Sequence, residues 1–182
     1  MALRKALTYS KRYARPYTRV SRAKGKSYIK VVPPNKVVKY TVGNSKAFYD
    51  NKFTFVVTMV AAQPSQIRDN ALEAARQFMT KVFDEKLPNN YYLEVKSQPH
   101  HILRNNKTAA GAGADRLSSG MRHSFGIVEG RAAIVKAGAP IFVAHCENDA
   151  AARIIREAMH MVKAKLPCGV RLLFEKKVVA QA

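Results

Sequence analysis

Acidic residues are absent from the first 49 positions of this 182-residue chain, although those positions hold 13 Lys and Arg. The rest of the chain carries 19 Lys and Arg together with all 12 acids, so most of the formal net charge of +20 lies near the N-terminus. With so few acids, no pair of carboxylates stands out as a general acid and base. A basic arm on a moderately basic body is instead typical of a chain that binds the phosphates of a polyanion.

Cysteine is also scarce, since Cys146 and Cys168 are the only two in the chain. Two thiols cannot form a four-thiolate zinc site, and nothing in the sequence marks a secreted disulfide framework. We therefore expect two reduced, partly buried thiols in a cytosolic protein.

Long apolar segments are lacking as well. The N-terminus is basic but has no apolar core of the kind that defines a signal peptide. The longest apolar run, residues 53–62, is about half the length of a membrane-spanning helix. These absences predict a soluble, cytoplasmic protein with no membrane partner.

The glycine-rich sequence GAGADR at 111–116 does not complete a nucleotide-binding motif. A dinucleotide fingerprint needs a third glycine where Arg116 stands, and the Gly-Lys-Ser/Thr of a triphosphate-binding loop is missing. The sequence belongs to a long segment, residues 105–122, with almost no large apolar residues. We interpret this segment as a loop whose small residues let the backbone come close to a large ligand, and we expect no cofactor.

Metal-binding and catalytic signatures are incomplete. His100 and His101 are adjacent, so in a strand they would point to opposite faces, and no companion motif supports a metal site. Asp115, Ser118 and His123 are close in sequence, but a fold gathers triad members from distant positions, so closeness is not evidence of catalysis. We expect no metal and no enzymatic activity; an RNA-processing or RNA-modifying enzyme is the alternative.

Hydrophobic periodicity predicts an α+β fold, with a compact strand-rich domain and two packed helices. The helices are expected at 65–86 and from Asn148, a good N-cap, to the residue before Pro167. Strands and helices do not alternate regularly, so a doubly wound sheet is not expected. The expected strands occupy 27–32, 36–42, 52–62, 91–99, 123–129, 130–138, 140–146 and 169–179.

Each predicted helix has one apolar face, which should pack on the strands. In the first helix this face consists of Leu72, Ala75, Phe78, Met79, Val82 and Phe83. In the second it consists of Ala151, Ile154, Ile155, Ala158, Met159 and Val162. Four arginines are expected on solvated faces, with phosphate contact as the alternative: Arg68, Arg76, Arg153 and Arg156.

Aromatic and basic residues are interleaved in the N-terminal residues 1–27. Tyr9, Tyr13 and Tyr17 recur every fourth residue among lysines and arginines, and Pro16 argues against one continuous helix. Tyrosine rings can stack on bases or riboses while the cations bind phosphates. We therefore predict a basic RNA-binding arm at 1–27, followed by a single α+β domain at 28–182 from which the loop 105–122 projects.

Residues 99–126 closely resemble the central signature of a universal large-subunit ribosomal protein family, numbered sixteen in bacteria and ten-e in archaea and eukaryotes. The archaeal-eukaryotic branch fits best. The matching residues are His100, His101, Leu103, Arg104, Ala112, Gly113, Ala114, Asp115, Arg116, Gly120, Met121, Arg122, Phe125 and Gly126. Residues 71–79 and 15–19 resemble the first helix and the N-terminal arm of the family, so the likeness spans about 1–165. The chain departs from the family at Ile127-Val128, where Lys-Pro is usual.

This resemblance implies a compact α+β domain of the hammerhead type and a structural role in the large ribosomal subunit. Family members bind large-subunit rRNA near the base of the central protuberance, among neighbouring ribosomal proteins. They lie beside the aminoacyl and peptidyl tRNA sites, and their central loop reaches toward the tRNA acceptor end. The resemblance therefore implies a tRNA-binding ribosomal protein of translation in which the rRNA performs the chemistry.

The predicted RNA-binding residues fall into two groups. The first lies in the arm and comprises Arg12, Tyr13, Arg15, Tyr17, Arg19, Arg22, Lys24 and Lys26. The second lies in the loop and at its base and comprises His101, Arg104, Lys107, Arg116 and Arg122. A DNA-packaging protein is a further alternative, which would prefer duplex DNA to structured rRNA at matched salt.

Overall fold

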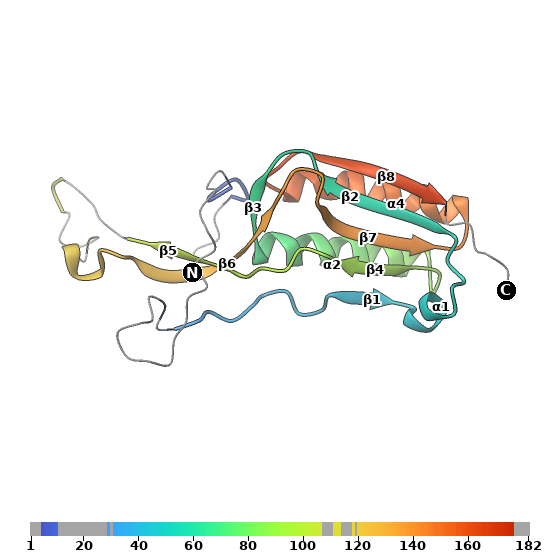
Figure 1. Ribbon diagram of the computed structural model, residues 1–182, viewed down its shortest axis with the longest axis horizontal. Coiled ribbons are helices and arrows are strands. Elements are labelled where there is room, and N and C mark those ends of the chain that lie inside the picture. The colour runs from blue at the N-terminus through green and yellow to red at the C-terminus, as the bar shows by residue number, and fades with distance from the viewer. Residues whose placement is uncertain are drawn as a thin grey trace.

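The computed structural model describes residues 5–10, 29, 31–106, 111–113, 118 and 120–176 (Figure 1). The expected arm falls largely outside these residues, as does much of the expected loop. The described part has two antiparallel sheets and two long helices, which confirms the predicted α+β class. None of its helices has the length and apolar character required to span a bilayer.

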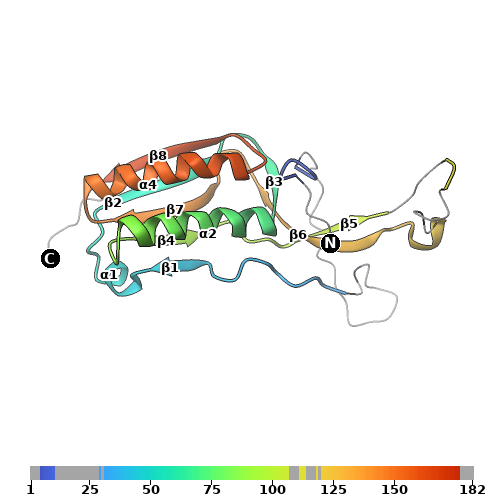
Figure 2. The ribbon, with the colours of Figure 1, turned by 180° about the vertical axis from the view of Figure 1, so that it is seen from behind.

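A five-stranded antiparallel sheet forms the larger layer, with the strand order β1-β4-β7-β2-β8. In that order the strands are Thr41–Gly43, Tyr92–Val95, Pro140–Cys146, Phe55–Ala61 and Val170–Lys176. Two helices, α2 (Asp69–Lys86) and α4 (Asp149–Val162), lie together against one face of the sheet (Figure 2).

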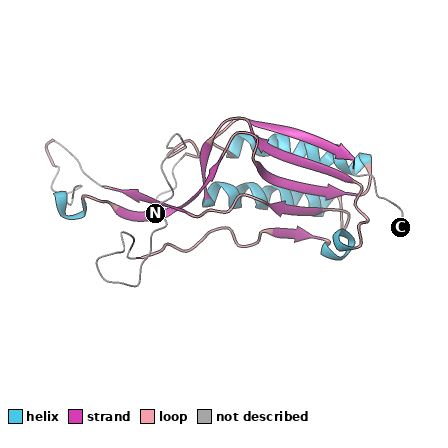
Figure 3. Ribbon diagram, viewed as in Figure 1, coloured by secondary structure: helices cyan, strands magenta, loops and turns pink. Residues whose placement is uncertain are grey.

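A separate three-stranded sheet has the order β3-β6-β5. Its strands β3 (Ser65–Arg68), β6 (Ile127–Val135) and β5 (His101–Asn105) are antiparallel. Strands β5 and β6 run away from the helices and the large sheet, and a short 3₁₀ helix, η1 (Gly120–His123), lies beyond them (Figures 1 and 3). We call the described residues of β5, η1 and β6 the projecting hairpin.

The main hydrophobic core lies between the large sheet and the two helices. Leu72, Met79 and Phe83 of α2 and Ile155 and Met159 of α4 are fully buried. Three more residues of the predicted apolar faces are partly buried at the edge of this core: Phe78, Val82 and Ile154. Both predicted helix faces are therefore confirmed, and the removal of their apolar surface from water stabilises the domain.

Short helical turns complete the body. Helix α1 (Ser45–Tyr49) was not predicted; its N-cap is Asn44, whose side-chain oxygen accepts a hydrogen bond from the Ala47 N–H at 3.0 Å. Phe48 of this helix stacks on Tyr92 of β4, with ring centroids 4.3 Å apart. A second 3₁₀ turn, η2 (Lys163–Lys165), follows α4.

Three predictions in the first 68 residues were wrong in whole or in part. Ser65–Arg68 is a strand and not the first turn of the helix, because it pairs with β6 in the small sheet. The strand predicted at 36–42 is confined to Thr41 and Val42, since backbone N–H groups of 36–38 donate to side-chain oxygens and not to a neighbouring strand. Residues 29, 31 and 32, the described part of the predicted strand 27–32, are not in a strand.

The strands predicted at 123–129 and 130–138 form one strand, β6, that begins at Ile127. Gly130 does not separate them, because it pairs with Leu103 of β5 next to a register shift between Leu103 and Arg104. That irregularity lets the ladder continue past the glycine. Cys146 and Cys168 are both free and buried, as predicted, and burial raises the pKa of the Cys146 thiol to about 12.

Candidate nucleic-acid interface

Three of the predicted RNA-binding residues lie in the described part of the chain: His101, Arg104 and Arg122. The others lie outside it, namely Arg12, Tyr13, Arg15, Tyr17, Arg19, Arg22, Lys24, Lys26, Lys107 and Arg116. The three described residues all belong to the projecting hairpin, but the structure gives them different surroundings.

Arg104 closes the base of the loop, at the outer end of strands β5 and β6. Its guanidinium carbon lies 3.6 Å from the ring centroid of Phe125, and its Nη1 donates a hydrogen bond to the Phe125 carbonyl at 2.8 Å. This combines a cation–π contact with a hydrogen bond between the end of β5 and the segment that enters β6. Arg104 therefore holds the two sides of the hairpin together.

Gly126 makes this closure sterically feasible. Its φ is +95°, in the left-handed region that favours glycine. A Cβ at this position would lie 3.1 Å from the Asn105 carbonyl carbon and 3.2 Å from the Arg104 Cβ. The Phe-Gly pair of the sequence thus supplies a ring for Arg104 and a residue small enough for the close backbone approach.

His101 is buried in β5, where it pairs with Ala132, whereas His100 is exposed. The adjacent histidines therefore differ in environment, although the strand that separates their side chains, β5, was not predicted. Burial lowers the pKa of His101, and the nearby charges of His100 and Arg104 lower it further. The imidazole is accordingly neutral at pH 7, and the described residues include no cluster of three metal-binding side chains.

Arg122 is exposed in η1 at the far end of the projecting hairpin. Met121 and Phe125 beside it are 74% and 42% exposed, and Ile127 is 44% exposed. A cation among exposed apolar side chains suits a nucleic acid, whose phosphates attract the charge while its bases and riboses pack on the apolar groups. Periodicity did not identify Met121, Phe125 and Ile127 as surface residues; only the family signature drew attention to the first two.

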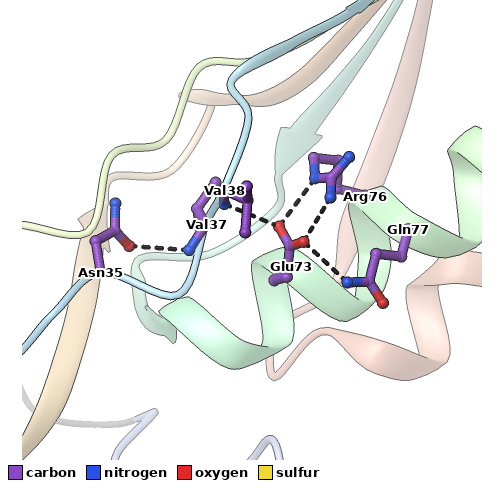
Figure 4. A network of polar contacts seen from close by, with 6 residues as sticks. All are labelled: Asn35, Val37, Val38, Glu73, Arg76 and Gln77. Atoms are coloured by element: carbon purple, nitrogen blue, oxygen red, sulfur yellow. Dashed lines mark hydrogen bonds and ion pairs between the residues drawn. The ribbon is translucent and has the colours of Figure 1, made fainter.

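The segment before β1 is held on α2 by buried charges (Figure 4). Glu73 accepts hydrogen bonds from Arg76 Nε and Gln77 Nε2, both at 2.9 Å, and from the Val38 N–H at 3.4 Å. The contact with Arg76 holds the pKa of Glu73 below its usual value although burial opposes this. Arg76 is only 9% exposed, so its predicted solvated placement was wrong; the ion pair that permits its burial was not anticipated.

Both described flanks of residues 11–28 are bound to the small sheet. On one flank, Arg68 Nη2 donates to the Lys5 carbonyl at 2.6 Å, and the Gln66 N–H donates to the Ser10 carbonyl at 3.0 Å. On the other flank, Arg131 Nε of β6 donates to the Pro33 carbonyl at 2.7 Å. Arg68 is buried for this reason, against the prediction, whereas Arg153 and Arg156 are exposed as predicted.

Comparison with known proteins gives a consistent result over nearly the whole chain. A family model described as ribosomal protein L16p/L10e matches residues 14–173. A relative from Caldivirga maquilingensis is 38% identical over 180 residues, which cover 98% of each chain. One from Thermofilum pendens is 40% identical over 177 residues, covering 97% of this chain and 99% of the relative. Both relatives are named large ribosomal subunit protein uL16.

Proposed function

Because the chain belongs to the ribosomal protein L16p/L10e family, we propose that it binds large-subunit rRNA and helps to organise the aminoacyl and peptidyl tRNA sites. The chain is a structural constituent of the large ribosomal subunit in the cytoplasm, and not an enzyme. Its partners are rRNA and neighbouring ribosomal proteins. The finer assignment, a position near the base of the central protuberance with contacts to tRNA, is the proposal.

The observation that carries the proposal is the geometry of the projecting hairpin. Strands β5 and β6 run away from the body, and Arg122 is exposed beyond them with Met121 and Phe125 (Figure 1). A surface of this kind can meet a nucleic acid while the body stays bound elsewhere. We assign Arg122, Lys107 and Arg116 to tRNA or the rRNA around it.

The acid-free N-terminal segment supplies the main rRNA contact in this proposal. Its cations neutralise phosphates, and Tyr13 and Tyr17 stack on bases or riboses. The cations assigned to phosphates are Arg12, Arg15, Arg19, Arg22, Lys24 and Lys26. We retain the division into an arm at 1–27 and a domain at 28–182 with the loop 105–122, in which His101 and Arg104 hold the base of the loop.

The proposal is tested by incorporation into subunits. A tagged full-length chain should sediment with the large subunit through a sucrose gradient at moderate salt. In the same subunits, joint replacement of Lys107, Arg116 and Arg122 by alanine should leave incorporation intact and weaken tRNA binding at the aminoacyl and peptidyl sites by at least about tenfold.

The matched control is Lys46→Ala, which removes an exposed cation from α1, at the opposite end of the molecule from the projecting hairpin (Figure 1). It should change neither incorporation nor tRNA binding. A chain that stays at the top of the gradient would refute the rRNA assignment. Normal tRNA binding by subunits that contain the triple variant would refute the tRNA assignment alone.

A further inference from the structure

We propose that the Glu129 carboxylate is a positioning group that couples the N-terminal segment to the projecting hairpin, so that rRNA binding by the arm sets the placement of the hairpin. This inference rests on the proposed function, because it takes the arm as an rRNA-binding element. It adds to that function a linkage between two surfaces that bind different parts of the ribosome.

The carboxylate of Glu129 bridges three segments of the chain. Glu129 lies on β6, and its Oε1 accepts a hydrogen bond from Asn105 Nδ2, at the end of β5, at 3.0 Å. Its Oε2 accepts a hydrogen bond from the Tyr9 hydroxyl, 120 positions earlier in the sequence, at 3.1 Å. One side chain therefore joins both strands of the projecting hairpin to Tyr9, in the described part of the arm.

The chemistry of Glu129 supports an internal role. An acid on an element that approaches RNA would repel phosphates, and this protein has only 12 acids among 182 residues. Glu129 is half-buried, and each of its two oxygens accepts a hydrogen bond from a neutral donor. Bonds to an ionised acceptor are stronger than bonds between neutral groups, so the negative charge strengthens the bridge itself.

The backbone at Tyr9 gives independent support. Its φ is +69°, in the left-handed region that a non-glycine residue seldom adopts. A residue keeps such a strained backbone conformation where several surrounding contacts hold it in place. The Lys5 and Ser10 carbonyls, on either side of Tyr9, accept hydrogen bonds from β3, which fixes this short turn and directs the tyrosine to β6.

A small pocket adjoins this bridge. A cavity of about 20 Å³, enough for one water molecule, lies between Tyr9, Arg68, Asp69, Glu129 and Arg131. Arg131 also donates to the Pro33 carbonyl, so the flank that follows the arm meets the same strand as Glu129. The described residues on both sides of 11–28 thus bind the small sheet, and this contiguous polar network can carry coupling in both directions.

The experiment measures amide hydrogen exchange in the full chain, free and bound to large-subunit rRNA purified from Thermofilum pendens, the source of a relative that is 40% identical. In the free wild-type chain, residues 103–105 and 127–130 should exchange slowly. Tyr9→Phe, which removes one hydroxyl, should raise their exchange rates about tenfold and leave α2 and α4 unchanged. Tyr49→Phe is the control, because Tyr49 lies in α1 and is 75% exposed.

The response to RNA distinguishes coupling from a merely structural contact. RNA should slow hairpin exchange in the wild-type chain and in Tyr49→Phe. Tyr9→Phe should bind the RNA within about twofold of wild-type affinity, but its hairpin exchange should no longer respond. Glu129→Gln keeps a carbonyl acceptor and should retain part of the response, whereas Glu129→Ala should abolish it.

Each outcome has a distinct meaning. Absence of RNA binding by the wild-type chain would refute the proposed function. RNA binding without slower hairpin exchange in the wild type would refute the coupling alone. A response in Tyr9→Phe as large as in the wild type would also refute it, because RNA would then protect the hairpin directly.

Discussion

Single carboxylates bind the acid-free N-terminal segment to the body of the protein. Asp69 accepts from the Lys36 N–H at 3.3 Å, Glu73 from the Val38 N–H, and Glu129 from the Tyr9 hydroxyl. These contacts use backbone N–H groups and a phenol, not lysine or arginine side chains. These three contacts do not use the positive charge of the segment, which suits a segment whose cations must meet phosphates.

The buried Glu73–Arg76 pair predicts a specific pH dependence of stability. Arg76 holds the pKa of Glu73 below the value of about 4.5 that it has in the unfolded chain. The pair therefore stabilises the fold above that pH, and its contribution is lost as the pH falls through the lowered pKa. Glu73→Gln should reduce the free energy of unfolding by about 1–3 kcal/mol at pH 7, and the difference from wild type should shrink below about pH 4.

Urea unfolding at a series of pH values between 3 and 7 measures this difference. The control is Glu85→Gln, since the Glu85 side chain is 61% exposed and pairs loosely with Lys81. It should change the free energy of unfolding little at any pH. A Glu73→Gln difference that is the same at pH 3 and pH 7 would show that the charge of Glu73 contributes nothing.

At the scale of elements, Gly126 controls how β5 and β6 meet. Gly126→Ala places a Cβ at 3.1 Å from backbone, in addition to the cost of a positive φ. We expect the projecting hairpin to lose about 1–3 kcal/mol of local stability, because the strand ends must separate to admit the methyl group. Amide exchange of residues 103–105 and 127–130 should accelerate accordingly, with little change in the helices.

Gly138→Ala is the matched control for this substitution. Its φ of +78° is also positive, but nothing lies within 4 Å of the added Cβ. The two variants therefore share the backbone cost and differ in the steric contact. Equal acceleration of hairpin exchange in both variants would contradict the role assigned to the close approach at Gly126.

Elements whose patterns are local could be predicted from the sequence. The apolar residues of α2 and α4 repeat at helical spacing, so both helices and their buried faces were found. Ser65–Arg68 was assigned to a helix because its strand character depends on pairing with β6, more than 60 residues later. No sequence pattern predicts the contact between Tyr9 and Glu129, which are 120 positions apart. The spacing of Glu73 and Arg76 would have predicted an ion pair, but not that the pair is buried.

The sequence predicted the family to which the candidate site belongs, but not how the residues of the site are arranged. The signature at 99–126 identified the family, which the comparison confirms. It did not separate Arg104, which closes the base of the loop, from Arg122, which is exposed beyond it. That distinction depends on Phe125 and Gly126 being brought against β5, and sequence spacing alone does not specify this contact.

At the scale of the whole molecule, charge and shape are arranged together. The first 49 residues carry 13 cations and no acid. The described flanks of residues 11–28 bind the small sheet, and the projecting hairpin extends from the same sheet. The end with α1, the C-terminal end of α2 and the N-terminal end of α4 lies opposite (Figure 1). One end of the molecule thus combines the described flanks of residues 11–28 with the element that reaches outward.

This arrangement predicts that the arm dominates the salt dependence of rRNA binding. Joint replacement of Arg12, Arg15 and Arg19 by glutamine should reduce the slope of log K against log salt by about 2–3, since each lost phosphate contact removes roughly 0.7–0.9. The control replaces three exposed cations of α4 and η2 by glutamine, namely Arg153, Arg156 and Lys163. It lowers the net charge by the same amount as the arm variant and should leave the slope nearly unchanged. Filter binding between 50 and 300 mM salt measures both. Equal losses of slope would mean that net charge, and not the arm, governs affinity.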